Sequence, residues 1–305
     1  MMSKFTEKRS GVIMPSDLKT IKGKTVYWVC FALMVFTALF TVVPTIWVIF
    51  TAFKDTQEIY QSFSFFPSDL TWDKITTRIA ESWQDMDMGL SIMNTLVLSF
   101  GNVAFDIVFN GLAGYVLSRL KPKGHKVILF AVLWTMMMPA QLRIVPKYIS
   151  YMSFPFASGD RGISLMDTYL PFWFTSMTNT FSIFMFKNAF DSVSISLVEA
   201  ARIDGCTDMK IFTKIMVPLA MPTVIYLAIN AVNASWSDFL MPYLVLKSDS
   251  KLITPVKIFL AKSDNTIPMN SYLMGLIIAS IPPFILFAIF QKHILGGVNV
   301  GGVKG

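Results

Sequence analysis

The chain has 305 residues, of which 54% are apolar and only 15% are charged, against about 25% charged in an average soluble domain. A soluble chain of this length needs a charged surface, so this composition excludes an ordinary soluble domain and predicts an integral membrane protein. The net charge of +7 is typical of a membrane protein whose basic residues lie in cytoplasmic loops beside the lipid bilayer. It favours this placement over nucleic-acid binding.

Six apolar runs are long enough to cross about 30 Å of hydrocarbon as helices, which takes roughly 20 residues each. In chain order they cover residues 26–53, 91–117, 127–145, 168–186, 222–246 and 272–290. We therefore predict an all-α integral membrane fold with six transmembrane helices. Around this domain (residues 26–291) we predict a cytoplasmic N-terminal segment (residues 1–25) and a cytoplasmic Gly-rich tail (residues 292–305).

The orientation follows from the positions of Lys and Arg, which favour cytoplasmic loops. With the N-terminus inside, 16 of the 26 basic residues lie on the cytoplasmic side. The short loop S-R-L-K-P-K-G-H-K, residues 118–126, is the clearest case, because it holds four Lys and Arg residues and no acid. Both termini are therefore predicted to be cytoplasmic, together with the loop between the fourth and fifth helices (residues 191–221).

That cytoplasmic loop carries unusual charge for a segment between two apolar runs. Residues 194–204, S-I-S-L-V-E-A-A-R-I-D, favour a short helix that Ser194 caps. Gly205 then permits a turn, and residues 208–217 resume a helical pattern before Pro218 and Pro222. The segment is thus either an interfacial amphipathic anchor or a docking site for a soluble partner. Arg202 either contacts that partner or pairs locally with Glu199 or Asp204.

The motif in this loop resembles that of a known family. E-A-A-R-I-D-G (residues 199–205), followed by I-M-V-P-L-A-M-P (residues 215–222), is similar to the EAA motif of ATP-binding-cassette importer permeases. Its form resembles the maltose-type carbohydrate uptake subfamily. V-P-T-I-W-V-I-F-T-A-F-K (residues 43–54), G-Y-V-L-S-R-L (residues 114–120) and the Gly-rich tail are also similar. Ser237 and Cys206 depart from the usual pattern, outside the EAA core.

The resemblance implies a bacterial inner-membrane permease that is not an enzyme. Its EAA helix would be a coupling helix seated on a separate ATPase subunit. This chain has no G-x-x-x-x-G-K-S/T sequence, so ATP and Mg would be used by that partner, and no cofactor is expected here. The implied partners are a second homologous permease, two ATPase subunits and an extracellular substrate-binding protein. The residues implied to couple to the ATPase are Glu199, Ala200, Ala201, Arg202, Asp204, Gly205 and Pro218.

Polar residues inside the predicted helices are costly unless they face protein or water. They occur in the second and fifth runs at helical spacing, which predicts a polar translocation path for hydroxyl-rich sugars. The alternative is hydrogen bonding between neighbouring helices. A proton relay through the two acids is a weaker alternative. The candidate path residues are Asn102, Asp106, Asn110, Asn230, Asn233, Trp236 and Asp238.

Other functions explain the sequence less well. A permease of the same type could import a polyol, glycerol-phosphate or modified sugar. An ion-coupled secondary transporter would need inverted repeats and broken helices around midplane charges, and would leave the EAA segment unexplained. The two histidines, His125 and His293, and the two cysteines, Cys30 and Cys206, have no metal-site spacing.

The predicted orientation is tested by tagging each loop and labelling intact cells from outside. We expect labelling of the loop at residues 54–90 and none near Glu199, because the membrane shields the cytoplasmic side. Labelling near Glu199 in intact cells would contradict the orientation.

Overall fold

The computed structural model describes residues 20–61, 64–154, 162–264 and 266–296. Regular structure within these ranges is helical, apart from one isolated bridge between Phe154 and Ile163. The predicted all-α class is therefore confirmed. The chain forms two compact units, Met1–Ile75 (unit 1) and Thr76–Gly305 (unit 2). Residues 1–19 of the predicted N-terminal segment and residues 297–305 of the predicted tail lie outside the described ranges.

Unit 1 is dominated by α1 (Ile21–Ala52), which is long and apolar enough to cross a membrane. The Thr20 hydroxyl caps it by accepting a hydrogen bond from the Gly23 N–H at 3.1 Å. The helix therefore begins five residues before the predicted first span. α2 (Thr56–Gln61) and the start of α3 (Trp72–Asp85) follow, and Lys74 forms an ion pair with Asp55 at 2.9 Å.

Unit 2 contains two further helices that could span a membrane. Residues Met88–Leu120 form one continuous helix, in which α4 (Met88–Phe105) and α5 (Gly111–Tyr115) alternate with the π-helical stretches η2 (Asp106–Asn110) and η3 (Val116–Leu120). The second is α16 (Met269–Gly296), which matches the sixth predicted run. These two helices and α1 agree with the first, second and sixth predicted spans.

The predicted continuous helices over residues 127–145 and 222–246 are wrong. In the first, α6 (His125–Met137) ends two residues before Pro139. It is followed by η4 (Ala140–Arg143) and α7 (Ile144–Met152), with a bend of 104°. Proline has no N–H and forces the preceding Met138 into an extended conformation, with ψ of 127°. In the second, α13 (Met221–Ser237) ends at the extended Asp238, before α14 (Leu240–Val245).

The predicted fourth span, residues 168–186, is also interrupted. α8 (Leu170–Ser176) ends before Asn179, which accepts hydrogen bonds from the Phe181 and Ser182 N–H groups and starts α9 (Thr180–Asp191). Further bends lie between α9 and α10 (Ile195–Ile203), at 78°, and before α13, at 81°. Within the described ranges, three helices are long enough to span, or up to six spans if each bent pair counts as one.

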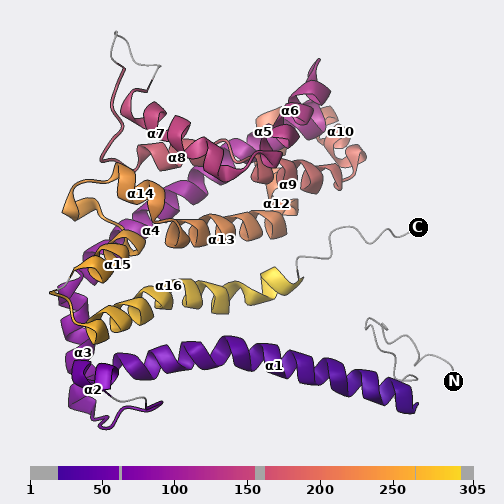
Figure 1. Ribbon diagram of the computed structural model, residues 1–305. Coiled ribbons are helices and arrows are strands. Elements are labelled where there is room, and N and C mark those ends of the chain that lie inside the picture. The colour runs from indigo at the N-terminus through magenta and orange to yellow at the C-terminus, as the bar shows by residue number, and fades with distance from the viewer. Residues whose placement is uncertain (1–19, 62–63, 155–161, 265, 297–305) are drawn as a thin grey trace. The chain divides into compact units, whose positions relative to one another are not determined.

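The remaining helices of unit 2 are short. Before α13 come α11 (Asp208–Ile211), the π-helical η5 (Phe212–Met216) and α12 (Val217–Leu219); η6 (Asp249–Lys251) and α15 (Thr254–Ser263) lie between α14 and α16. α4 packs against α8 and α13, α5 against α9, and α13 against α16 (Figure 1). These contacts bury two clusters of apolar side chains, one around Phe190 and one around Val245.

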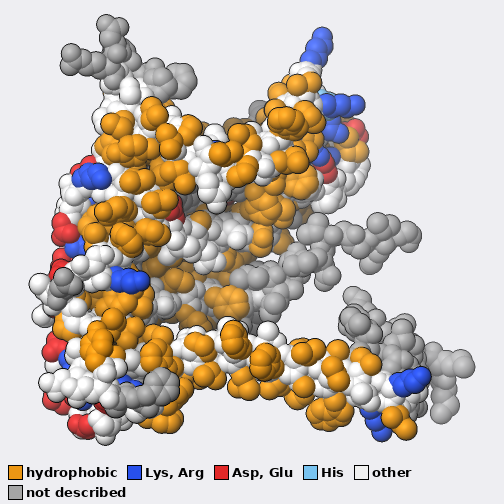
Figure 2. All heavy atoms as spheres, in the orientation of Figure 1, with side chains coloured by type: hydrophobic (Ala, Val, Ile, Leu, Met, Phe, Trp, Pro, Cys, Tyr) orange, Lys and Arg blue, Asp and Glu red, His pale blue; other side chains and the backbone are white. Residues whose placement is uncertain are grey.

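The surface of unit 2 is largely apolar. Figure 2 shows hydrophobic side chains spread over its helices, while Lys and Arg side chains gather near α6 and α10. On α6, Val127, Phe130, Trp134 and Met137 are each more than half exposed. Apolar side chains exposed in this density are expected where a helix faces lipid or another apolar helix.

Gly114 allows α5 and α9 to approach closely. A Cβ atom there would lie 2.6 Å from the Phe186 Cβ and 2.9 Å from the Lys187 backbone nitrogen. We predict that Gly114→Ala lowers the free energy of unfolding by about 1–3 kcal/mol, because the two helices must separate. Gly111→Ala is the control, since its new Cβ meets nothing nearer than Phe212 Cζ at 3.4 Å. Equal melting temperatures for the two purified variants would contradict this packing.

Candidate functional site

The segment with the EAA motif forms a helix, a turn and a second helix, as the sequence predicts. α10 is followed by Gly205 in a left-handed conformation, with φ of +78°. The predicted cap is wrong in detail, because the Ser194 hydroxyl lies 2.6 Å from the Ser196 hydroxyl and makes no capping bond to the backbone. Thr207 caps α11 instead, where its hydroxyl accepts a hydrogen bond from the Lys210 N–H.

The two alanines of the motif face different surroundings. Ala201 is 7% exposed and packs inward, whereas Ala200 is exposed. Glu199, Arg202 and Asp204 are also exposed. α10 therefore presents an outward surface of charged and small residues, and only one alanine contributes to it.

Arg202 has a local ion-pair partner that the sequence analysis missed. Its Nη2 lies 3.0 Å from Asp208 Oδ1, so its partner in the structure is Asp208 rather than Glu199 or Asp204. The hydroxyl of Tyr115, which is buried on α5, donates to the same carboxylate oxygen at 3.3 Å. Asp208 thus ties the turn after α10 to the second predicted span.

An apolar cluster holds the motif segment on the helices behind it. Val198 and Ala201 of α10 pack with Ile211, Phe212 and Met216, which follow the turn. The same cluster includes side chains of α5, α9 and α13, namely Tyr115, Phe186, Phe190, Val224 and Leu227. Pro218 lies outside the cluster, exposed in the first turn of α12. α10 is therefore packed closely against side chains of α5, α9 and α13.

The candidate path residues of the second span lie on one side of it but bind neighbouring helices. The Asn110 Nδ2 donates to Asp106 Oδ1 at 2.9 Å and to the Ser176 carbonyl at 2.8 Å. The Ser182 hydroxyl donates to Asp106 Oδ2 at 3.0 Å. Asp106 is 2% exposed and Asn110 is fully buried. These contacts favour the helix-joining alternative for both residues.

The candidates of the fifth span are more exposed. The Asn230 amide donates to the Tyr226 carbonyl one turn earlier, and Asn233 is exposed. The Trp236 Nε1 is buried with no hydrogen-bond partner among the described residues. Asp238 lies where the helix ends, and its Oδ1 accepts from the Met241 N–H at 3.4 Å. The seven candidates therefore do not form one site.

Two of the seven candidate path residues, Asn102 and Asp238, line the same small cavity, which has a volume of about 180 Å³. The Asn102 amide donates to the Ser235 hydroxyl at 2.9 Å and accepts from the Ser176 hydroxyl at 3.0 Å. These bonds join α4 to both α8 and α13.

A larger cavity of about 870 Å³ shares Asp238 with the small one. Its wall contains a residue from each of three helix interruptions: Ala140 after Pro139, Asn179 between α8 and α9, and Asp238 after α13. Sequence reasoning missed several of its polar and aromatic lining residues, among them Gln141, Arg143, Lys147, Tyr151 and Thr175. The available signal was Pro139, which marks the interruption beside them.

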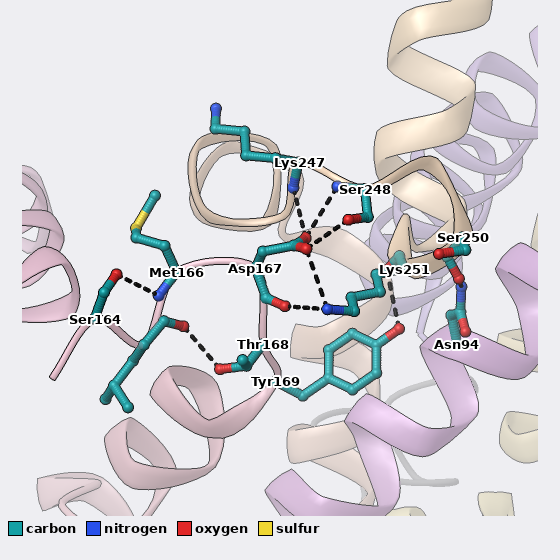
Figure 3. Close-up of polar contacts among 11 residues, drawn as sticks. Asn94, Ser164, Met166, Asp167, Thr168, Tyr169, Lys247, Ser248, Ser250 and Lys251 are labelled. Atoms are coloured by element: carbon teal, nitrogen blue, oxygen red, sulfur yellow. Dashed lines mark hydrogen bonds and ion pairs between the residues drawn. The ribbon is translucent and has the colours of Figure 1, made fainter.

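A polar cluster around Asp167 joins two loops at one end of unit 2 (Figure 3). Its Oδ1 accepts from the N–H groups of Lys247 and Ser248, both at 2.9 Å, and its Oδ2 accepts from the Ser248 hydroxyl. Lys251 Nζ donates to the Asp167 carbonyl at 2.7 Å and lies 3.1 Å from its carboxylate. Asp167 has a φ of +58°, which Asp tolerates better than most residues.

The same contacts set the charge state of Asp167. Hydrogen bonds from the Ser248 side chain and backbone hold the pKa of the Asp167 carboxyl well below its usual range, with smaller contributions from Lys247 and Lys251. Because the pKa is lowered in the folded protein, this carboxylate stabilises the fold above the ordinary Asp pKa of about 3.9. The contribution is lost as the pH falls from there through the lowered value.

The described residues contain no group of three or more His, Cys, Asp or Glu side chains that could hold a metal ion.

Comparison of the sequence with models of known protein families assigns this chain to a family. The sequence model described as "Binding-protein-dependent transport system inner membrane component" matches residues 110–299. This range includes the E-A-A-R-I-D-G motif and the second-span residue Asn110, but not Asn102 or Asp106.

Individual proteins match over most of the chain. The arabinooligosaccharides transport system permease protein AraQ of Halalkalibacterium halodurans is 29% identical over 281 residues, which are 90% of this chain and 94% of that protein. AraQ of Bacillus subtilis is 30% identical over 212 residues, 70% of this chain and 72% of that protein. A crystal structure of a bacterial ABC transporter involved in alginate import has a chain with the same fold. The two chains superpose with a TM-score of 0.75 and are 22% identical in sequence. The match covers 90% of this chain and 98% of the transporter chain.

We predict that Asp167→Ala destabilises the purified protein at pH 7 by about 1–3 kcal/mol, because two backbone N–H groups and Lys251 lose their acceptor. The measurement is the melting temperature, and its difference from the parent protein shrinks below about pH 4. Asp264→Ala is the control, because the hydrogen bonds of Asp264 stay within its own turn. An equal loss in both variants at pH 7 would contradict the role of the Asp167 cluster.

Proposed function

Because this chain belongs to the family of binding-protein-dependent transport system inner membrane components, we propose that it is one permease subunit of an ATP-driven importer for oligosaccharides or other carbohydrates. The observation that carries the proposal is the E-A-A-R-I-D-G segment, which lies within the family match and forms an exposed helix ahead of a glycine turn. The carbohydrate class is supported by relatives named for arabino-oligosaccharide transport.

The proposed topology has six membrane spans (residues 26–291), one for each of the six apolar runs, with α10, α11 and α12 outside the membrane. Both termini, residues 1–25 and 292–305, lie in the cytoplasm. The coupling loop, residues 191–221, is then cytoplasmic, and the Asp167 cluster faces the outside. The sixteen basic residues on the inner side support this orientation.

In the proposed mechanism, α10 is the coupling helix and rests on a separate ATPase subunit that binds ATP and Mg. Glu199, Ala200 and Asp204 are exposed for that contact, while Ala201 packs inward and holds the helix in place. Arg202 and Asp208 stabilise the turn at Gly205. Closure of the ATPase subunits would displace α10, and the apolar cluster would pass this movement to α5, α9 and α13.

The proposed assembly contains a second, homologous permease, two ATPase subunits and an extracellular substrate-binding protein. Six spans enclose a full pathway only together with a second subunit. In this chain the pathway would run along the two cavities that share Asp238, past Asn102. Asp106 and Asn110 would hold the helices together beside it.

We predict that Gly205→Val reduces ATP-dependent uptake about tenfold while the protein still inserts in the membrane. A side chain at φ of +78° costs roughly 1–2 kcal/mol in backbone strain. No described atom lies within 4 Å of the new Cβ position, so the loss would come from the turn and not from a clash.

Gly205→Asn is the matched control, because Asn adopts the left-handed conformation more readily and should keep most of the uptake. The measurement is sugar uptake into proteoliposomes that hold the complete transporter. Full uptake by Gly205→Val would count against the proposed coupling role of this turn.

A further inference from the structure

The larger cavity has three charged residues in its wall, and two of them are cations from the same short stretch of chain. Arg143 closes η4 and Lys147 follows four positions later in α7, so both side chains lie on one side of this helical turn. Like charges at this spacing destabilise a helix. Arg143 is exposed and Lys147 is half-buried, and together they give this side of the cavity a positive charge.

The protein supplies only part of that compensation. Asp238 is the one acid in the cavity wall, which it shares with Arg143 and Lys147. In the described part of the chain, neither Arg143 nor Lys147 has a carboxylate oxygen within 4.0 Å of its charged nitrogens. By formal charge the two cations exceed Asp238 by one, so a singly charged anion bound in the cavity would balance the wall.

The rest of the wall suits a sugar. Phe174 and Phe181 offer aromatic surface, and Gln141 and Thr180 offer an amide and a hydroxyl group. A volume of about 870 Å³ is within the usual range of ligand sites, roughly 300–1,000 Å³. The cavity thus combines groups that contact neutral sugar surfaces with an uncompensated positive charge.

We propose that this cavity binds a sugar unit with a single negative charge, a carboxylate or a sulfonate, within the transported oligosaccharide. The Arg143 guanidinium donates two parallel hydrogen bonds to the acid group, and the Lys147 ammonium adds a point charge beside it. Asp238 repels a second negative charge and so disfavours a phosphate dianion. This inference rests on the proposed function and narrows its substrate class to acidic carbohydrates.

The test uses proteoliposomes that contain the complete transporter and its binding protein, with two probes of equal length, trigalacturonate and maltotriose. Uptake of the acidic probe should exceed that of the neutral probe. Arg143→Gln should reduce the acidic-to-neutral uptake ratio by about 10- to 100-fold, because a charged hydrogen bond is lost. Arg143→Lys keeps the positive charge but loses the paired N–H donors of the guanidinium, so it should give an intermediate acidic-to-neutral uptake ratio.

Lys262→Gln is the matched control, since Lys262 is exposed in the last turn of α15 and does not line the cavity. It should leave the ratio unchanged. A higher uptake of maltotriose, or equal ratios in Arg143→Gln and Lys262→Gln, would overturn this inference and leave the proposed function intact. ATP-dependent uptake of neither probe would overturn both.

Discussion

Backbone polar groups cannot stay unpaired in hydrocarbon, and this constraint explains where the helices of unit 2 are interrupted. Each unsatisfied N–H or C=O costs several kcal/mol in lipid, so irregular backbone is tolerated only within protein or beside water. The interruptions at Pro139, Asn179 and Asp238 come from three different parts of the sequence, yet all border the same cavity. A water-filled cavity at this place would satisfy the exposed backbone groups, and it would also provide a route for a polar solute.

The same helices carry the connection to the motif segment. α9 begins at the Asn179 interruption and ends beside α10, and its Phe186 and Phe190 lie in the apolar cluster that holds α10. α13 begins in that cluster, through Val224 and Leu227, and ends at Asp238. Two helices therefore reach from the motif segment to the cavity. In the proposed mechanism, a movement at one end would change the geometry at the other, since tightly packed interiors transmit displacement.

Much of this fold follows from the sequence, and the exceptions have physical reasons. Long apolar runs predicted α1, α4 and α16, because hydropathy alone identifies a helix that crosses lipid without a break. The glycine turn at Gly205 was predicted because few other residues adopt a positive φ. The interruptions were missed because residues 127–145 and 222–246 are mostly apolar, although Pro139 marks one of them.

The site was harder to predict than the fold. Helical spacing placed Asp106 and Asn110 on one face correctly, but it cannot say whether that face meets water or another helix, and both residues are buried. The pairing of Arg202 with Asp208 requires the chain to turn back at Gly205. Arg143 and Lys147 belong to no sequence motif, and the bend after α6 brings them into the same cavity wall as Asp238.

The central claim is that ATP hydrolysis by partner subunits drives a solute through this chain. The most direct measurement is accumulation of a labelled oligosaccharide in proteoliposomes that hold the complete transporter, with ATP supplied or withheld and with ionophores present or absent. The account predicts accumulation that requires ATP and the binding protein and that persists when ionophores collapse all ion gradients. Accumulation that needs no ATP and stops with the ionophores would contradict it.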